Sequence, residues 1–154
     1  MSESLTIRRV DTQNADFVSL VASLDRDLSI RDGADHDFYA NFNHITPDFH
    51  AVVAYIDGQP AGCGAWKELF DDAVEIKRMY TTENARKMGV ATAILQALEE
   101  WAKEMAFAKC MLETGINQPE AIKLYENRGY VRIANYGQYA DVPDSRCFEK
   151  WLKQ

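Results

Sequence analysis

Residues 86–91, with the sequence RKMGVA, constrain the fold most because they join a predicted strand to a predicted helix. They follow the run 74–80, whose composition is typical of a strand, and they open a helical pattern of apolar residues. The amides of such a loop and of the first helical turn lack partners within the helix, and the helix dipole favours negative charge there. Gly89 lets the backbone approach a ligand closely, and the neighbouring arginine and lysine add positive charge. These features predict a phosphate-binding turn.

Two common phosphate-binding motifs do not match this turn. A dinucleotide-binding fingerprint needs three spaced glycines, and the turn contains Gly89 alone. The phosphate loop of nucleotide hydrolases ends in Gly-Lys-Ser or Gly-Lys-Thr, and the chain has no such run. The predicted site therefore belongs to another class of phosphate-containing ligand.

Length and composition limit the other classes of protein. The 154 residues fit one domain spanning residues 1–154. No apolar run approaches the ~20 residues of a membrane span, and the first residues lack the features of a secretory signal, so we expect a cytoplasmic protein without a membrane partner. Cys63, Cys110, Cys147 and the three histidines have neither disulfide-framework nor metal-ligand spacing. We therefore expect buried thiols and no metal.

The distribution of charge separates the two halves of the chain. The net charge of −7 argues against a nucleic-acid partner. Residues 1–75 contain 5 Lys/Arg and 14 Asp/Glu, a net of −9, whereas residues 76–154 contain 12 Lys/Arg and 10 Asp/Glu, a net of +2. A polyanionic cofactor suits the second half, and the acidic first half suits a cationic amine or serves solubility alone.

The hydrophobic pattern predicts a mixed α/β fold. Alternating or β-branched runs predict strands at residues 5–10, 50–56, 61–69, 73–81, 109–113, 130–135 and 145–151. Helical spacing and capping residues predict helices at 16–28, 36–41 and 90–107, and a further helix from a cap at Asn117 to Gly129. The Asp-Gly pair at residues 57–58 predicts a hairpin turn, so the early strands should form an antiparallel meander. The helix after the phosphate turn should be a right-handed crossover between parallel strands.

Several motifs together resemble a known family. Besides residues 86–91, these are Glu75 on the preceding strand and the segment 117–130, which contains Asn117, the run Leu-Tyr-Glu and Gly-Tyr. They resemble the GNAT superfamily of N-acetyltransferases, which use acetyl-CoA. The resemblance extends from about residue 52 to residue 151. It implies a GNAT-like fold, with a partly open, twisted mixed sheet of about seven strands and about four helices.

The resemblance also implies which residues carry the chemistry. Tyr125 matches a tyrosine that lies beside the cofactor sulfur, where a phenol could protonate or hydrogen-bond the departing thiolate. Glu75 matches a glutamate that some members use as a base, directly or through water. Glu113 is a rival because a parallel strand could bring it close, and the amine could instead lose its proton to solvent.

The predicted cofactor-binding residues lie on the strand before the turn, in the turn, and near the last helix. The strand should offer backbone groups to the pantetheine arm, and a bulge near its end would open the sheet and aim an amide at the acetyl carbonyl. For Asn117, helix capping, cofactor contact or both are open. The residues are Met79, Tyr80, Thr81, Arg86, Lys87, Met88, Gly89, Val90, Ala91, Thr92, Asn117 and Tyr125.

The resemblance implies transfer of acetyl from acetyl-CoA to a primary amine of a small molecule or peptide, by direct attack in a ternary complex. A non-catalytic acyl-CoA-binding module is the alternative, and a longer acyl chain or a homodimer is compatible with the motifs. The residues considered for the acceptor site are Asp32, Asp35, His36, Asp37, Tyr39, Tyr136 and Tyr139.

Overall fold

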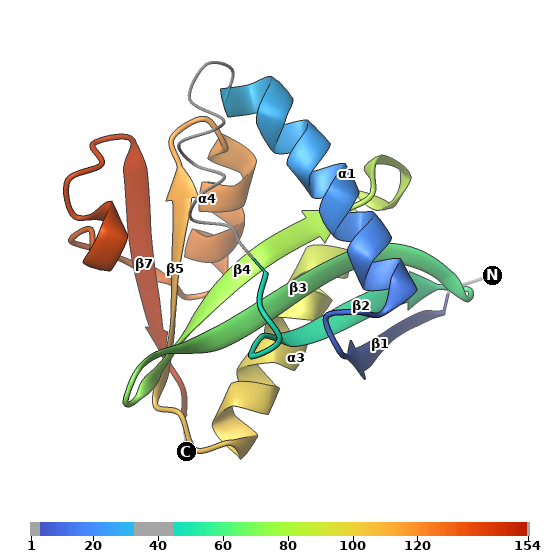
Figure 1. Cartoon of the computed structure of the whole chain (residues 1–154), viewed down its shortest axis with the longest axis horizontal. Coiled ribbons are helices and arrows are strands. Elements are labelled where there is room, and N and C mark those ends of the chain that lie inside the picture. The colour runs from blue at the N-terminus through green and yellow to red at the C-terminus, as the bar shows by residue number, and fades with distance from the viewer. Residues whose placement is uncertain (1–3, 33–44, 154) are drawn as a thin grey trace.

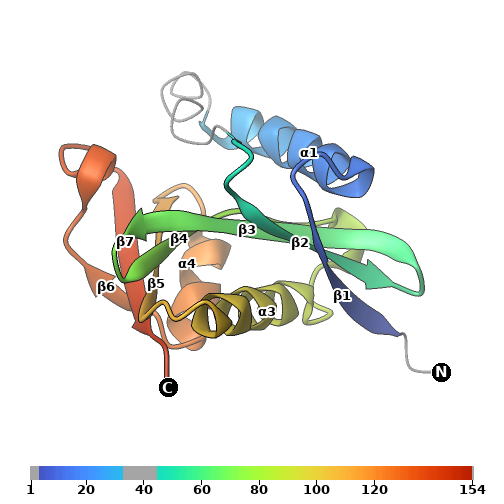
Figure 2. The ribbon, with the colours of Figure 1, turned by 60° about the horizontal axis from the view of Figure 1, so that its bottom comes forward.

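The computed structural model describes residues 4–32 and 45–153. They form one seven-stranded sheet in the order β1-β2-β3-β4-β5-β7-β6. Helix α1 covers one face, and helices α3 and α4 cover the other (Figures 1 and 2). The strands are β1 Leu5–Val10, β2 His50–Ile56, β3 Gln59–Phe70, β4 Ala73–Thr81, β5 Lys109–Gly115, β6 Val131–Ile133 and β7 Ser145–Trp151. The helices are α1 Ala15–Asp32, α3 Val90–Glu104 and α4 Pro119–Asn127, with 3₁₀ turns η2 Glu83–Ala85 and η3 Gly137–Tyr139.

The topology confirms the predicted meander and crossover. Strands β1 to β4 pair antiparallel in chain order, and β4 then pairs parallel with β5 after the chain crosses through α3. The hairpin between β2 and β3 turns at Asp57 and Gly58, whose φ angles are 50° and 83°. Positive φ at both positions suits the twist of a two-residue hairpin, which explains the Asp-Gly pair.

Two predictions about the helices need correction. Helix α4 begins at Pro119 with Gln118 as its N-cap, so the prediction that Asn117 caps this helix is wrong. Proline fits the first helical position because it has no N–H to satisfy, and this places the cap at the residue directly before it. The described residues contain three α-helices rather than four, and the helix predicted at 36–41 lies outside them.

A bulge in β4 opens the sheet. Cys63 pairs with Tyr80 and Ala65 pairs with Lys77, so a single β3 residue faces both Arg78 and Met79. The φ angle of Arg78 is 60°, which gives the strand a sharp local turn. Pairing between β4 and β5 runs from Ala73–Lys109 to Ile76–Leu112. Beyond that point the two parallel strands separate into a wedge, as the bulge predicted near Met79 implied.

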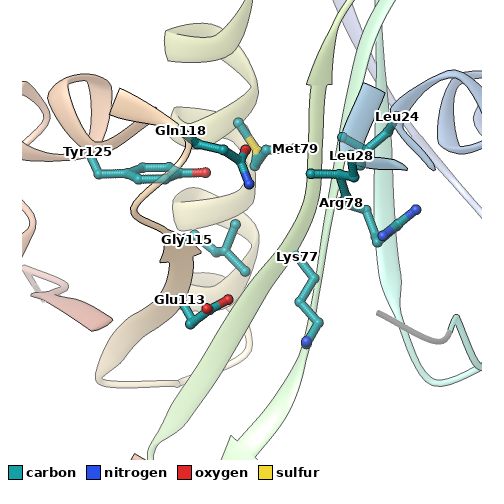
Figure 3. A pocket seen from close by; sticks show the side chains of 10 residues that line it. Leu24, Leu28, Lys77, Arg78, Met79, Glu113, Gly115, Gln118 and Tyr125 are labelled. Carbon is teal, nitrogen blue, oxygen red and sulfur yellow. The ribbon is translucent and has the colours of Figure 1, made fainter. Parts of the chain in front are cut away.

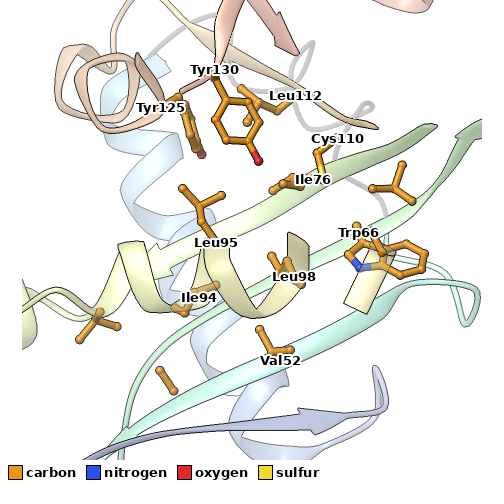
Figure 4. Close-up of a cluster of buried hydrophobic side chains, with 14 of the residues drawn as sticks. Val52, Trp66, Ile76, Ile94, Leu95, Leu98, Cys110, Leu112, Tyr125 and Tyr130 are labelled. Atoms are coloured by element: carbon orange, nitrogen blue, oxygen red, sulfur yellow. The ribbon is translucent and has the colours of Figure 1, made fainter. Parts of the chain in front are cut away.

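The largest core cluster lies between the sheet and helices α3 and α4 (Figure 4). Ile94, Leu95 and Leu98 of α3 are completely buried there. Helix α3 approaches β3 closely at Gly62 and Gly64, where an added Cβ would lie 2.9 and 2.7 Å from side-chain carbons of Val90 and Ile94. A second cluster lies under α1 on the other face. The close approach of α3 fixes the position of its N-terminal turn beside the wedge.

Candidate active site

Two adjoining cavities lie at the wedge. The turn cavity, of about 530 Å³, lies between the end of β4, the phosphate turn, α1 and α4. The wedge cavity, of about 80 Å³, lies between the separated strands (Figure 3). Five described residues line both cavities and mark their junction: Leu24, Leu28, Met79, Gln118 and Tyr125. A ligand in the turn cavity therefore reaches the wedge cavity past these side chains.

The phosphate turn presents its backbone to the turn cavity. Lys87 and Gly89 have φ angles of 68° and 80°, and Gly89 is the N-cap of α3. A Cβ at Gly89 would meet no atom within 4 Å, so the turn is open to an approaching group. Within the described part of the chain, no backbone carbonyl accepts a hydrogen bond from the amides at Val90, Ala91 and Thr92. The turn thus offers unpaired donors at the positive end of a helix dipole.

The side chains around the turn carry both signs of charge. The Arg86 guanidinium donates to the Thr81 carbonyl at 3.2 Å and pairs with Asp27 of α1 at 3.0 Å. Both members of this pair are partly exposed. Arg86, Lys87 and Asp27 all line the turn cavity. The Asp27 carboxylate therefore holds Arg86 beside the predicted phosphate position.

Most of the predicted cofactor residues surround the turn cavity. Ten line it: Met79, Tyr80, Thr81, Arg86, Lys87, Gly89, Val90, Ala91, Thr92 and Tyr125. Met88 and Asn117 line neither cavity and are exposed. The other residues that line this cavity were not predicted from the sequence: Leu24, Asp27, Leu28, Ala85, Gln118, Glu120, Ala121 and Leu124. The spacing of three, then four, residues from Gln118 through Ala121 to Tyr125 could have identified the α4 face, because such residues share one side of a helix.

Tyr125 joins the two cavities. It projects from α4 toward the junction, and its ring packs edge-on against Tyr130 at a centroid distance of 5.8 Å (Figure 3). Its side chain is buried, and Figure 4 shows it beside Tyr130. Burial raises the pKa of the Tyr125 phenol, and the nearby negative charge of Glu113 adds to that effect. The hydroxyl therefore stays protonated at neutral pH and can donate a hydrogen bond into the junction.

The two candidate bases have different surroundings. Glu75 is 1% exposed and lines neither cavity, and its carboxylate accepts a hydrogen bond of 2.7 Å from the Tyr136 hydroxyl. Glu113 lines the wedge cavity and accepts a hydrogen bond of 2.5 Å from the Ser145 hydroxyl. Glu75 pairs with Met111 across the parallel ladder, so Glu113 lies two residues further along the same face. The wedge therefore brings Glu113, rather than Glu75, to the cavity.

Lys77 is a buried cation at the wedge cavity. Its ammonium donates to the Tyr139 hydroxyl at 2.9 Å and lies 3.8 Å from Glu75. Burial lowers the pKa of Lys77, and the negative charges of Glu75 and Glu113 oppose this shift. Tyr136 and Tyr139, both considered for the acceptor site, thus contact the buried charges of β4. The other acceptor residues considered, Asp35, His36, Asp37 and Tyr39, lie outside the described residues, and Asp32 ends α1.

The described residues contain no group of three or more His, Cys, Asp or Glu side chains arranged to hold a metal ion. All three cysteines are buried and free. Burial raises the pKa of the Cys63 and Cys110 thiols to about 12, so neither is a thiolate at neutral pH. Within residues 4–32 and 45–153, every helix is too short or too polar to cross a bilayer.

A seven-stranded sheet opened between β4 and β5, beside a phosphate-type turn, is the arrangement of an acetyltransferase of the GNAT fold. Residues 17–130 match the Acetyltransferase (GNAT) family. An IAA acetyltransferase from Azospirillum brasilense is 30% identical over 97% of this chain and 99% of that protein. The chain therefore belongs to the GNAT acetyltransferase family.

Solved structures share the fold. One described as a candidate acyl-CoA N-acyltransferase from Klebsiella pneumoniae has a TM-score of 0.80 and 29% identity, with 97% of this chain and 98% of that chain covered. N-acetylglutamate synthase from Neisseria gonorrhoeae, complexed with coenzyme A and N-acetyl-glutamate, has a TM-score of 0.72 and 18% identity. That match covers 100% of this chain and 36% of the synthase, and at this identity it concerns the fold alone.

Proposed function

We propose that this protein transfers an acetyl group from acetyl-CoA to a primary amine by direct attack in a ternary complex. The observation that carries the proposal is the junction at Tyr125, where a cavity beside a phosphate-type turn meets a smaller cavity that contains a carboxylate. Family membership supports acyl transfer, and the unpaired amides at the start of α3 support a donor that carries phosphate. The amine of a small molecule or peptide would enter the wedge cavity.

The turn cavity suits a long polyanionic donor. The amides at the start of α3, together with Arg86 and Lys87, would hold the diphosphate. The β5-facing edge of Met79, Tyr80 and Thr81 lies beyond the last β4–β5 pair, so its backbone groups can pair with the amides of the pantetheine arm. Acetyl-CoA supplies an acetyl group that its thioester activates for transfer. The protein supplies position, charge and exclusion of water.

Two side chains assist the reaction in this proposal, one at the amine and one at the departing sulfur. Glu113 accepts the proton of the incoming amine, because its carboxylate lines the wedge cavity whereas that of Glu75 is buried beside Tyr136. Tyr125 donates a hydrogen bond to the departing sulfur. Since its phenol pKa is raised well above the ~8.5 of a thiol, full proton transfer from Tyr125 is uphill and hydrogen-bond stabilisation is its larger contribution. Glu75 is a positioning residue, because it holds the side chains of Lys77 and Tyr136 in place.

The test combines binding with turnover. Calorimetry measures the Kd of coenzyme A, and a thiol assay measures its release from acetyl-CoA in the presence of a panel of primary amines. Binding together with amine-dependent release supports transfer. Binding without release across the panel would favour a non-catalytic acyl-CoA-binding module, and absence of binding by folded protein would refute both assignments.

A pair of variants tests the base. Glu113→Gln should lower kcat by about 10²-fold or more. It should also remove the increase of kcat with pH that ionisation of the base produces in the wild type. Glu75→Gln keeps the size of the buried side chain and should leave the pH profile in place while it lowers kcat less. The reverse ranking would return the role of base to Glu75.

A further inference from the structure

Gln118 occupies the junction of the two cavities. It is the N-cap of α4, and its side chain lines both the turn cavity and the wedge cavity. Of the five described residues that line both, Leu24, Leu28 and Met79 are apolar. Gln118 and Tyr125 are therefore the two described junction residues that can donate a side-chain hydrogen bond to a ligand.

The helix directs Gln118 and Tyr125 to the same place. They are seven residues apart, which is about two helical turns, and both line the two cavities. Ala121 lies between them in the sequence and lines the turn cavity, and its small side chain leaves room for a ligand. In Figure 3 the amide end of Gln118 lies between the Tyr125 phenol and Met79. The amide and the phenol thus face one ligand position.

The backbone of Gln118 is fixed, while its side chain is available. Its amide donates to the Gly115 carbonyl at 3.1 Å, and its carbonyl accepts from Ala121 and Ile122 at 3.1 and 3.2 Å. The cap has no side-chain hydrogen bond to the helix. Within the described part of the chain, no residue hydrogen-bonds the side-chain amide of Gln118. A half-buried amide on an anchored backbone is preorganised to bind a carbonyl group at the junction.

We propose that Gln118 is a catalytic residue whose side-chain amide donates a hydrogen bond to the carbonyl oxygen of the acyl group. The proposal rests on the acyl transfer proposed above. The amine nitrogen bonds to the carbonyl carbon, the carbon–sulfur bond breaks with its electron pair on sulfur, and the amine proton passes to Glu113. During this attack, Gln118 stabilises the negative charge that develops on the carbonyl oxygen. Tyr125 donates a hydrogen bond to the departing sulfur. A backbone amide at the β4 bulge, near Met79, gives a second donor to the same oxygen.

The central test is Gln118→Met, which keeps the length of the side chain and removes its donor. We expect kcat to fall by about 10²-fold, the scale for loss of one donor to a developing oxyanion, while the Kd of coenzyme A stays within twofold. The matched control is Gln96→Met, because Gln96 is an exposed glutamine of α3 that lines neither cavity. The control should retain the wild-type kcat. An unchanged kcat in Gln118→Met, or a loss confined to the Kd of coenzyme A, overturns the proposal.

A double-mutant cycle separates contact with the acyl group from an effect through Tyr125. If Gln118 stabilises the carbonyl oxygen, Gln118→Met should lower kcat about as much in the Tyr125→Phe background as in the wild type. If the amide merely orients the phenol, the second substitution will have no further effect, and the proposal is overturned. Failure of the underlying function has another signature, because the wild-type protein would then release no thiol with any amine.

Discussion

Replacement of Gly62 by alanine tests how the packing of α3 positions the donor site. An added Cβ at Gly62 would lie 2.6 Å from the Tyr80 carbonyl oxygen, 2.9 Å from Val90 Cγ1 and 3.0 Å from Ile94 Cδ1. The oxygen belongs to the backbone of β4, and Val90 is the first residue of α3. A shift of either the strand or the helix to make room for the Cβ would therefore move part of the site. Overpacking of this kind costs about 1–3 kcal/mol. The gain in strand stability from Gly to Ala, about 0.5–1 kcal/mol, offsets part of it.

We therefore expect the free energy of unfolding to fall by roughly 1–2 kcal/mol in Gly62→Ala, which lowers Tm by about 2–8 °C in a domain of this size. Calorimetric or denaturant unfolding measures this change. The Kd of coenzyme A should rise as well, because Tyr80 and Val90 both line the turn cavity. Gly115→Ala is the stability control, since its Cβ would lie 4.0 Å from the nearest atom. Equal stability of Gly62→Ala and Gly115→Ala would refute the packing argument.

Three further outcomes follow from the site. Tyr125→Phe should lower kcat by about 10²-fold with little change in the Kd of coenzyme A, and undiminished turnover in the thiol assay would remove its assigned role. Asp27→Asn should lower the Kd of coenzyme A about two- to fivefold in calorimetry, because it releases Arg86 from a partly exposed ion pair. The Kd of unphosphorylated pantetheine should not change. A higher Kd of coenzyme A in this variant would contradict the reasoning. The free energy of unfolding should fall as pH rises above about 9, because burial raises the pKa of Cys63 and Cys110 to about 12 while the thiols of the unfolded chain ionise near 9. Denaturant titrations between pH 8 and 11 measure this slope, which Cys63→Ala should reduce; a flat profile would show that burial does not hold these thiols protonated.

The sequence by itself predicted the elements whose causes are local. The Asp-Gly pair predicted the β2–β3 hairpin, and both residues have the positive φ that such a turn requires. The single glycine before an apolar helical pattern predicted the start of α3, and Gly89 is its N-cap. These features depend on backbone preferences within a few residues, so the local sequence carries enough information to fix them.

At the start of α4, the preference of proline for the first helical position outweighs the capping preference of asparagine. Asparagine is a better capping residue than glutamine, which favoured Asn117. Pro119 instead occupies the first helical position and moves the cap to Gln118. That shift of one residue turns the Gln118 side chain to the junction and leaves Asn117 exposed. The cofactor contact predicted for Asn117 stays a prediction.

The tertiary structure alone decided which carboxylate and which part of α1 face the cavities. Glu75 and Glu113 lie on one face of adjacent parallel strands. Both are glutamates, so residue type alone does not show which of them reaches a cavity. The wedge opens just beyond Ile76 and Leu112, so it exposes Glu113 and leaves Glu75 buried. Likewise, no local pattern in α1 marks Asp27 as the partner of Arg86, 59 residues away. Such relations arise from strand pairing and helix packing between distant segments, and their geometry exists only after the sheet has formed.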